Sequence, residues 1–221
     1  NERQNAWREM AKQVAHEIKN PLTPMKLSVQ HLSRSLLLAE KSDERTLKDF
    51  QSKMVQQINV LSEIADEFSN YAELPKGNMK QLDLLKILQK TINLFKHESQ
   101  VDFKINQNNI SSFTILGDEN QLIRVFNNLI QNSLQAMNNK GLIEINFIKT
   151  RANLVVHFID NGPGIPLAIH QKIFEPKFTT KSKGKGLGLA LVWQIISNHN
   201  AKISISNNSQ GAHFIISFNL L

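Results

Sequence analysis

Residues 1–73 contain two stretches in which apolar side chains recur every three or four positions, and this spacing constrains the fold most. It places the apolar side chains along one stripe of an α-helix, whereas a strand requires alternation. The polar sequence LAEKSDER separates the stretches, so we expect an antiparallel helical hairpin. The two stripes are Met10, Val14, Ile18, Leu22, Met25, Val29, Leu32 and Leu36, then Leu47, Phe50, Met54, Ile58, Leu61, Ala65, Phe68 and Ala72.

A two-helix hairpin buries one side of each helix and leaves apolar surface in water. Pairing with a second copy in a four-helix bundle removes that surface, so the sequence predicts a homodimer. The segment AELPKGNMK contains Pro75 and Gly77 and ends the second helix. We therefore predict two domains, a dimerising helical hairpin over 1–75 and a second domain over 76–221.

The second domain alternates between helical and extended patterns. Predicted helices are LLKILQKTINLF, DENQLIRVFNNLIQNSLQAM and GLGLALVWQIISNH, and predicted strands are VDFKIN, FTILG, GLIEINFIKT, NLVVHFID, KISISN and AHFIISFNL. We expect strands adjacent in sequence to be antiparallel. The pattern predicts an α/β sandwich with its helices on one face of the sheet.

Composition removes several classes of protein. The 221 residues include no cysteine, which excludes disulfides and thiolate metal sites. The net charge is +7, but the basic residues are scattered and are not interleaved with aromatics, so we expect a solvated surface and no nucleic-acid partner. No apolar run reaches the roughly 18 residues that span a bilayer. The chain starts without Met inside a helical pattern, so we expect a fragment of a longer protein, with any membrane anchor in the missing N-terminal part.

The sequence VAHEIKNPLTP places a histidine just before two prolines in the first predicted helix. His16 lies two residues from Ile18, about 200° around the helix, and so we expect it to point away from the apolar stripe. Pro21 and Pro24 each remove a backbone donor, which predicts a kink just past His16. Our hypothesis is that this kink is a bistable hinge.

The helix predicted from Asp118 to Met137 carries Asn128 and Asn132, which are four residues apart and share a face. Two amide oxygens on one face could bind Mg²⁺ together with phosphates. Asparagine is also common on helix surfaces, so this pair alone is a weak signal.

The loop DNGPGIP follows a predicted strand and has two interpretations. Asn-Gly is typical of a hairpin turn. A ligand loop is the alternative, with Asp160 accepting from an amino group such as adenine N6, and Gly162 and Gly164 letting the backbone approach the ligand. A helix-like segment follows in place of a partner strand, which favours the ligand loop.

Gly184, Gly186 and Gly188 run into the start of a predicted helix, as in phosphate sites built from backbone donors. Simple flexibility is the alternative interpretation. The spacing matches neither a Walker loop nor a dinucleotide fingerprint. The preceding segment IFEPKFTTKSK suits a mobile lid, with Phe178 among its apolar anchors and Lys181 among the lysines available to phosphates.

Five motifs follow one another along the chain: HEIKNPL, NNLIQNSLQAM, DNGPGIP, FEPKFTTK and GKGLGLAL. In this order they resemble the H, N, G1, F and G2 boxes of bacterial two-component sensor histidine kinases. The stretch WREMAKQVAHEIKNPLTPMKLSVQHL most resembles the nitrogen-regulation, NtrY-like type, and the resemblance covers nearly the whole chain from about Trp7. It implies a dimeric bundle followed by a Bergerat-type (GHKL) ATP-binding sandwich, in a cytoplasmic fragment of a sensor anchored in the bacterial inner membrane.

The resemblance also implies roles for particular residues. His16 matches the phosphoacceptor, Glu17 the general base, and Asn20 the residue that orients water when a response regulator receiver domain is dephosphorylated. Asn132, assisted by Asn128, matches the Mg²⁺ ligand. The residues that match the ATP site are Asn128, Asn132, Asp160, Gly162, Gly164, Phe178, Lys181, Gly184, Gly186, Leu187 and Gly188.

Lys185 departs from the family pattern, because many members have a small residue between the first two glycines of the last box. Two alternatives to a kinase remain at this point. An ATPase of the gyrase, Hsp90 and MutL group would hydrolyse ATP without a stable phosphohistidine. A dimeric interaction module, or a nucleic-acid binder driven by the charge of +7, would need no ATP.

Overall fold

The computed structural model describes residues 2–37, 44–72, 77–96, 100–108, 110, 112–176, 178–180, 186–208 and 211–220. The chain divides into two compact units, Asn1–Glu73 and Leu74–Leu221, and each is described here by itself. No helix within the described ranges combines the length and hydropathy that a bilayer crossing requires.

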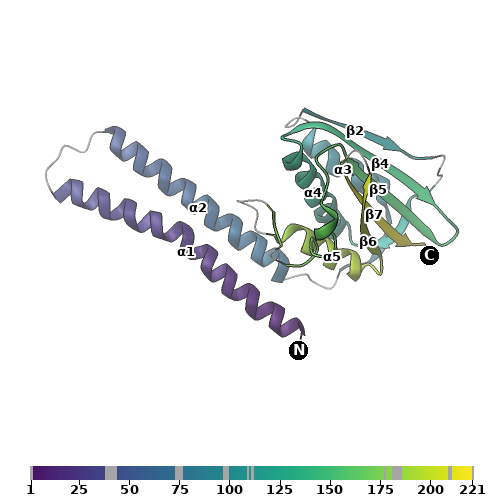
Figure 1. Cartoon of the computed structure of the whole chain (residues 1–221), viewed down its shortest axis with the longest axis horizontal. Helices are drawn as coiled ribbons and strands as arrows, with labels where there is room; N and C mark the ends of the chain where they lie inside the picture. Colours follow the sequence, from purple (N-terminus) through teal and green to yellow (C-terminus); the bar gives the residue numbers. More distant parts are fainter. Residues whose placement is uncertain are drawn as a thin grey trace. The chain divides into compact units, whose positions relative to one another are not determined.

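The first unit is the predicted hairpin, formed by α1 (Glu2–Leu37) and α2 (Glu44–Ala72) (Figure 1). Among the side chains of the two helices whose burial is described, the positions that are at least partly buried follow a heptad pattern, and Pro21 and Ile64 are the buried ones. The partly buried positions on α1 are Val14, Ile18, Met25, Ser28 and Leu32, and those on α2 are Phe50, Met54, Gln57, Val60 and Leu61.

The predicted stripes are therefore wrong in part, because they merge two faces of each helix. Four large hydrophobic side chains of the predicted stripes are about half exposed, at 46–48% of their area: Leu22, Val29, Leu47 and Ile58. A 3.6-residue helix presents apolar residues on two neighbouring stripes when it has more than one partner, and a list of three- and four-residue steps cannot separate them.

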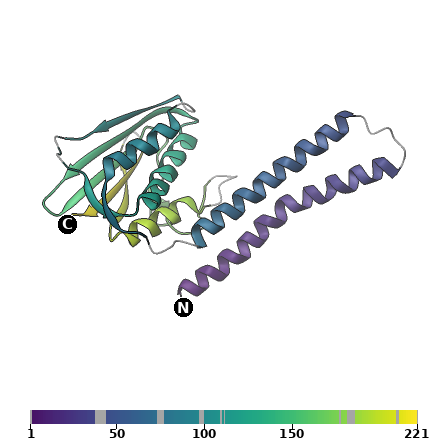
Figure 2. The ribbon, with the colours of Figure 1, turned by 180° about the vertical axis from the view of Figure 1, so that it is seen from behind.

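The two prolines lie inside α1, which continues through both of them as one helix (Figures 1 and 2). Pro21 is buried and Pro24 is exposed. The hydroxyl of Thr23 donates a 3.0 Å hydrogen bond to the carbonyl of Lys19, four residues earlier. Such back-bonding is common where Thr sits inside a helix, and it often bends the helix.

The second unit contains two sheets and three α-helices in its described part. Its elements are β1 (Lys80–Asp83), α3 (Leu84–Phe95), β2 (Gln100–Asn106), β3 (Thr114–Gly117), α4 (Glu119–Ala136), β4 (Lys140–Lys149), β5 (Asn153–Asp160), the 3₁₀ helix η1 (Leu167–Ile169), α5 (Gly188–Asn198), β6 (Lys202–Asn208) and β7 (Gly211–Asn219). The larger sheet has the order β2-β4-β5-β7-β6, and the smaller one pairs β1 with β3. The three helices cover one face of the larger sheet (Figures 1 and 2), so the predicted α/β sandwich is confirmed.

The expectation that strands adjacent in sequence pair antiparallel holds for β4 with β5 and for β6 with β7, but it is wrong for β2 and β3. Strand β2 pairs in parallel with β4, and β3 pairs with β1, a strand that we did not predict. A parallel pair needs a long crossover, and the chain makes it through β3 and α4. Strand β1 has only four residues, too few to show a period.

The core lies between the larger sheet and the helices. Strand β5 alternates strictly between buried and half-buried residues, and its buried residues face the helices. Helix α4 contributes a fully buried stripe composed of Leu122, Val125, Phe126, Leu129 and Ile130. The opposite face of the sheet carries the half-buried residues. This alternation fixes which residues at the end of β5 face α4.

Candidate functional site

Asp160 is the last residue of β5, and its side chain is only 3% exposed. One carboxylate oxygen, Oδ1, accepts from the backbone N–H groups of Gly162 at 3.0 Å and Ala212 at 3.1 Å. The other oxygen, Oδ2, accepts from the hydroxyl of Ser133 at 2.6 Å. Three donors from three segments thus hold one buried carboxylate, and Oδ2 keeps acceptor capacity for an amino group.

Ser133 and Gly211 belong to this cluster, and sequence reasoning missed both. Ser133 is 1% exposed and lies on the core side of α4, where a polar residue interrupts the apolar stripe, and this interruption was the available signal. Gly211 packs directly against the backbone of Asp160. A Cβ atom built on Gly211 would overlap the Asp160 carbonyl oxygen and lie 2.9 Å from its Oδ1.

The two glycines of DNGPGIP meet different structural requirements, close packing at Gly162 and backbone conformation at Gly164. A Cβ on Gly162 would lie 3.1 Å from Oδ1 of Asp160 and 3.3 Å from Met137, so a side chain here would require these neighbours to shift by a few tenths of an ångström. Gly164 has φ of +74°, a left-handed conformation that glycine adopts without strain. The segment that follows is the 3₁₀ helix η1, which is consistent with a ligand loop and excludes a simple hairpin turn.

Helix α4 carries the asparagine motif and contacts both the loop DNGPGIP and the glycine-rich segment. Its Ser133 donates a hydrogen bond to Asp160 at the start of the loop, and its Asn128 lies against Gly188, the first residue of α5. A Cβ on Gly188 would lie 2.7 Å from Oδ1 of Asn128, while Nδ2 of Asn128 donates to the carbonyl of Arg124 at 2.8 Å. Asn132 is half-buried one turn further along α4. Three motifs separated by many residues in the sequence therefore converge around one helix.

The start of α5 offers backbone donors. Its cap position, Leu187, provides no side-chain hydrogen bond, and Gly186 just before it has φ of +67°. The first-turn N–H groups of a helix attract anions when no side chain caps them. Phe178 packs against the core as a half-buried side chain. Lys181 and Gly184, which we predicted for the same site, lie outside the described residues, as does Lys185.

The predicted phosphoacceptor region lies in the other unit. His16 and Glu17 are part of α1, but their side chains lie outside the described residues, so the predicted direction of His16 stays a prediction. Asn20 is exposed on the same helix, just before the buried Pro21.

Asp118 fixes the start of α4. Its carboxylate accepts from the backbone N–H groups of Gln121 at 3.0 Å and Asn78 at 2.8 Å, and its own N–H donates to Nε2 of His199 at 3.0 Å. Burial raises the pKa of this carboxyl, but the backbone donors of Gln121, Asn78 and Asn120 outweigh that effect, and the pKa lies below its ordinary value. The chain entering the domain, α4 and the end of α5 meet at this residue.

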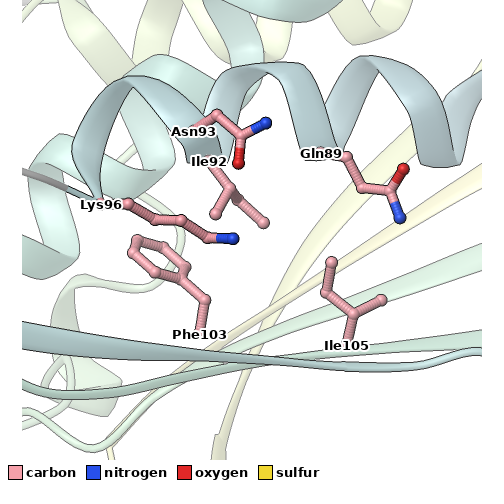
Figure 3. Close-up of a pocket in the computed structure, with 6 residues that line it drawn as sticks. All are labelled: Gln89, Ile92, Asn93, Lys96, Phe103 and Ile105. Atoms are coloured by element: carbon pink, nitrogen blue, oxygen red, sulfur yellow. The ribbon is translucent and has the colours of Figure 1, made fainter.

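A separate cleft of about 250 Å³ opens between α3 and the edge strand β2 (Figure 3). Six residues line it: Gln89, Ile92, Asn93, Lys96, Phe103 and Ile105. None of them belongs to the predicted nucleotide site. Within the described residues no group of three or more His, Cys, Asp or Glu side chains could hold a metal ion. The amide groups of Asn128 and Asn132 on α4 stay the predicted ligands for a hard cation such as Mg²⁺.

Two family models match the chain. Residues 6–77 match the His Kinase A (phospho-acceptor) domain, and residues 117–221 match the histidine kinase-, DNA gyrase B-, and HSP90-like ATPase. Among curated proteins, the nitrogen regulation protein NtrY of Azorhizobium caulinodans is 30% identical over 220 residues, which cover 95% of this chain and 28% of that protein. A putative NtrY-like sensor histidine kinase of Rickettsia bellii is 31% identical over 218 residues, which cover 97% of this chain and 36% of that protein.

Solved structures give the same result. The histidine kinase ThkA in complex with the response regulator protein TrrA aligns with a TM-score of 0.78 at 27% identity, over 99% of this chain and 63% of that chain. The catalytic domain of ThkA aligns with a TM-score of 0.59 at 29% identity, over 64% of this chain and 95% of that chain. The chain spans about a third of the length of the curated relatives it matches.

Proposed function

Because the chain belongs to the two-component sensor histidine kinases of the NtrY type, we propose that it phosphorylates His16 with ATP and passes the phosphoryl group to an aspartate of a response regulator. The observation that carries this proposal is the convergence on α4: Ser133 bonds to the buried Asp160, and Asn128 lies against Gly188. This arrangement supports the proposal, because it brings a buried carboxylate, amide side chains and the uncapped start of α5 around one helix.

The nucleotide is recognised at both ends. Asp160 accepts from the adenine N6 amine through the remaining capacity of Oδ2, and a guanine, which has a carbonyl at this position, is rejected. Ser133 acts as a positioning residue, since its hydroxyl sets the direction of the Asp160 carboxylate. The N–H groups at the start of α5 face the phosphates, and the lid residues Phe178 and Lys181 belong to the same site.

Mg²⁺ is the metal that this donor set fits, because amide oxygens are hard ligands and the phosphates complete the coordination. Asn132 is the proposed ligand on α4, with Asn128 beside it. When bound, the ion offsets the charge of the phosphates and polarises the transferred group.

The phosphotransfer step takes place at His16. An imidazole nitrogen attacks the γ-phosphorus, the bond from this phosphorus to the β–γ bridging oxygen breaks, and ADP leaves. The imidazole proton passes to Glu17, which acts as the general base. In the next step the phosphoryl group moves from His16 to a carboxylate oxygen of the receiver aspartate. The ThkA structure, which contains the response regulator TrrA, supports a partner of this class.

The chain acts as a homodimer through its helical hairpin. The half-exposed apolar residues of α1 and α2 support this proposal, because a second hairpin would cover them in a four-helix bundle. Asn20, exposed on α1, orients water for hydrolysis of the aspartyl phosphate, which gives the protein phosphatase activity toward the same regulator. Pro21 and Pro24 form the hinge that shifts the balance between the two activities.

The deciding experiment incubates the chain with γ-labelled ATP and Mg²⁺ and compares it with His16→Gln and with His31→Gln, an exposed histidine on the same helix. We expect an acid-labile, base-stable label on the parent and on His31→Gln, and none on His16→Gln. Label that survives in His16→Gln would assign the acceptor elsewhere. ATP hydrolysis without any acid-labile label would favour the ATPase alternative. That alternative does not explain why residues 6–77 match a phosphoacceptor domain.

A further inference from the structure

The face of the larger sheet that points away from the helices carries two histidines on neighbouring strands. His157 lies on β5 and His213 on β7, at diagonal positions of an antiparallel pair in which His157 is opposite Ile215 and His213 opposite Ile159. Both side chains are half-buried. The proposed kinase function uses neither of them, because Asp160 and the other nucleotide residues belong to the helix-facing side or to the loops.

The two imidazoles form a hydrogen bond, and this bond holds their facing nitrogens close to the spacing of a chelating pair. Nδ1 of His157 and Nε2 of His213 are 2.9 Å apart, and the ring centroids are 5.1 Å apart. Two nitrogens bound to one tetrahedral Zn²⁺ ion, each about 2.0–2.1 Å from the metal, lie roughly 3.3 Å apart. The nitrogens therefore need to separate by only a few tenths of an ångström, which half-exposed rings on a rigid sheet can supply by small rotations.

The protonation state also suits a metal ion. Burial lowers the pKa of both histidines, and the proximity of His157 lowers that of His213 further. Neutral imidazole is the form that binds metals. In the neutral pair one of the two facing nitrogens carries a proton, and that proton moves to the other nitrogen of its own ring when a metal takes its place. Binding at neutral pH thus needs no net release of protons.

We propose that His157 and His213 form a binding site for a late first-row divalent cation such as Zn²⁺ on the open face of the sheet. Imidazole ligands favour Zn²⁺, Ni²⁺ and Cu²⁺, whereas Mg²⁺ prefers oxygen ligands, so this site and the nucleotide site select different ions.

Neighbouring strands supply polar groups around the pair. Asn146 on β4 is opposite His157, and Ser206 on β6 is opposite His213. Opposite residues of an antiparallel pair have Cβ atoms about 4.5–5.5 Å apart. Oδ1 of Asn146 already accepts a hydrogen bond from Nδ2 of Asn106, so Ser206 is the side chain placed to ligate the ion or to bond to its water ligands. Glu144 lies on the same face, but its carboxylate forms a 3.0 Å ion pair with Lys104 and is not counted as a ligand here. The ion would have two imidazole ligands, with its remaining positions open to water.

The test is calorimetric titration of the whole chain with ZnCl₂ at pH 7.5, in the presence of excess Mg²⁺. The variants are His157→Gln and His213→Gln, and the matched control is His31→Gln, an exposed histidine on α1. We expect one Zn²⁺ per chain in the parent and in the control, and at least tenfold weaker binding in each of the other two variants. Equal affinity in the parent and both variants would overturn the proposal, as would an absence of saturable binding in the parent.

A second measurement needs no variant and so does not depend on how well the variants fold. Imidazole ¹⁵N resonances of the parent chain are recorded during the same Zn²⁺ titration. We expect the largest shifts at Nδ1 of His157 and Nε2 of His213, in equal stoichiometry. Shifts confined to other histidines would show that the pair is only a hydrogen-bonded contact.

Discussion

The helical hairpin and the α/β domain differ in how completely each buries its own apolar side chains. Of the large hydrophobic residues that are fully buried in the described part of the chain, only Ile64 belongs to the hairpin. The α/β domain instead has a continuous core between its sheet and three helices. In the proposed function, this difference means that the nucleotide site rests on a domain with its own core, whereas the helix that carries His16 gains its core from a second copy, because small units bury too little apolar surface to be stable alone.

The largest effect should come from Gly211→Ala, which tests whether the packing of the α/β domain around Asp160 supports ATP binding. The added Cβ would collide with the backbone of Asp160, and the φ of +152° is unfavourable for alanine. We expect the free energy of unfolding of the α/β domain to fall by about 3 kcal/mol, as for severe overpacking, and ATP binding to be lost. Guanidinium unfolding and calorimetry with an ATP analogue measure both. Unchanged ATP affinity would show that the backbone contact at Asp160 is dispensable.

The reciprocal change, Ile58→Glu, tests the dependence of the hairpin on a partner. Ile58 is 48% exposed in the single chain, and a buried unpaired carboxylate in a four-helix bundle is strongly unfavourable. We expect the dimer dissociation constant to rise by about a hundredfold, a change that corresponds to about 2.7 kcal/mol, with ATP binding retained. Light scattering after gel filtration measures the mass. Asn59→Glu, an exposed neighbour, is the control, and a similar loss of dimer there would contradict the proposed interface.

Ser133→Ala tests whether the Ser133 hydroxyl positions the Asp160 carboxylate in the proposed nucleotide site. The change removes the 2.6 Å hydrogen bond to Oδ2 of Asp160. A hydrogen bond to a charged group contributes about 1.5–3 kcal/mol, so ATP affinity should weaken by about tenfold or more. Gln131→Ala, an exposed position on α4, should leave the affinity unchanged. Equal affinities for all three proteins would mean that Ser133 does not position the carboxylate.

Pro21→Ala addresses the hinge in the hairpin. Alanine restores a backbone donor for the Glu17 carbonyl and stiffens α1 beyond the phosphoacceptor. We expect the ratio of autophosphorylation rate to regulator dephosphorylation rate to change by a few-fold, with the dimer intact. The two rates are measured on one preparation. If both rates stay at their parental values, Pro21 has no hinge role.

The smallest effect concerns pH and is confined to the α/β domain. The pKa values of His157 and His213 lie below the 6.5 of the unfolded chain because burial disfavours the charged form. Below pH 6.5 the unfolded state therefore binds more protons, and stability falls as pH falls through the folded pKa values. Melting temperatures at pH 7.5 and 5.5, recorded with EDTA, should fall less in the doubly substituted His157→Gln, His213→Gln protein than in the parent. Equal slopes would remove the histidine pair as the cause.

The sequence by itself determined the family and all the long helices and strands, but not the four-residue strand β1. Periodicity located the hairpin and the helices of the second domain, because apolar spacing reflects the local geometry of the chain. The order of five motifs indicated the histidine kinases and named Asp160, Asn128 and Gly188 before any contact was known.

Only the tertiary structure decided how these parts meet. The pairing of β2 with β4 joins strands that are far apart in sequence, and no local pattern encodes such a crossover. The division of each hairpin helix into an inner and an outer apolar stripe depends on the position of its neighbour. Ser133, Gly211 and the histidine pair acquire their roles through contacts with residues 27, 51 and 56 positions away. Such contacts form only when the chain has folded, because the pairing of strands and helices, and not the sequence nearby, brings these side chains together.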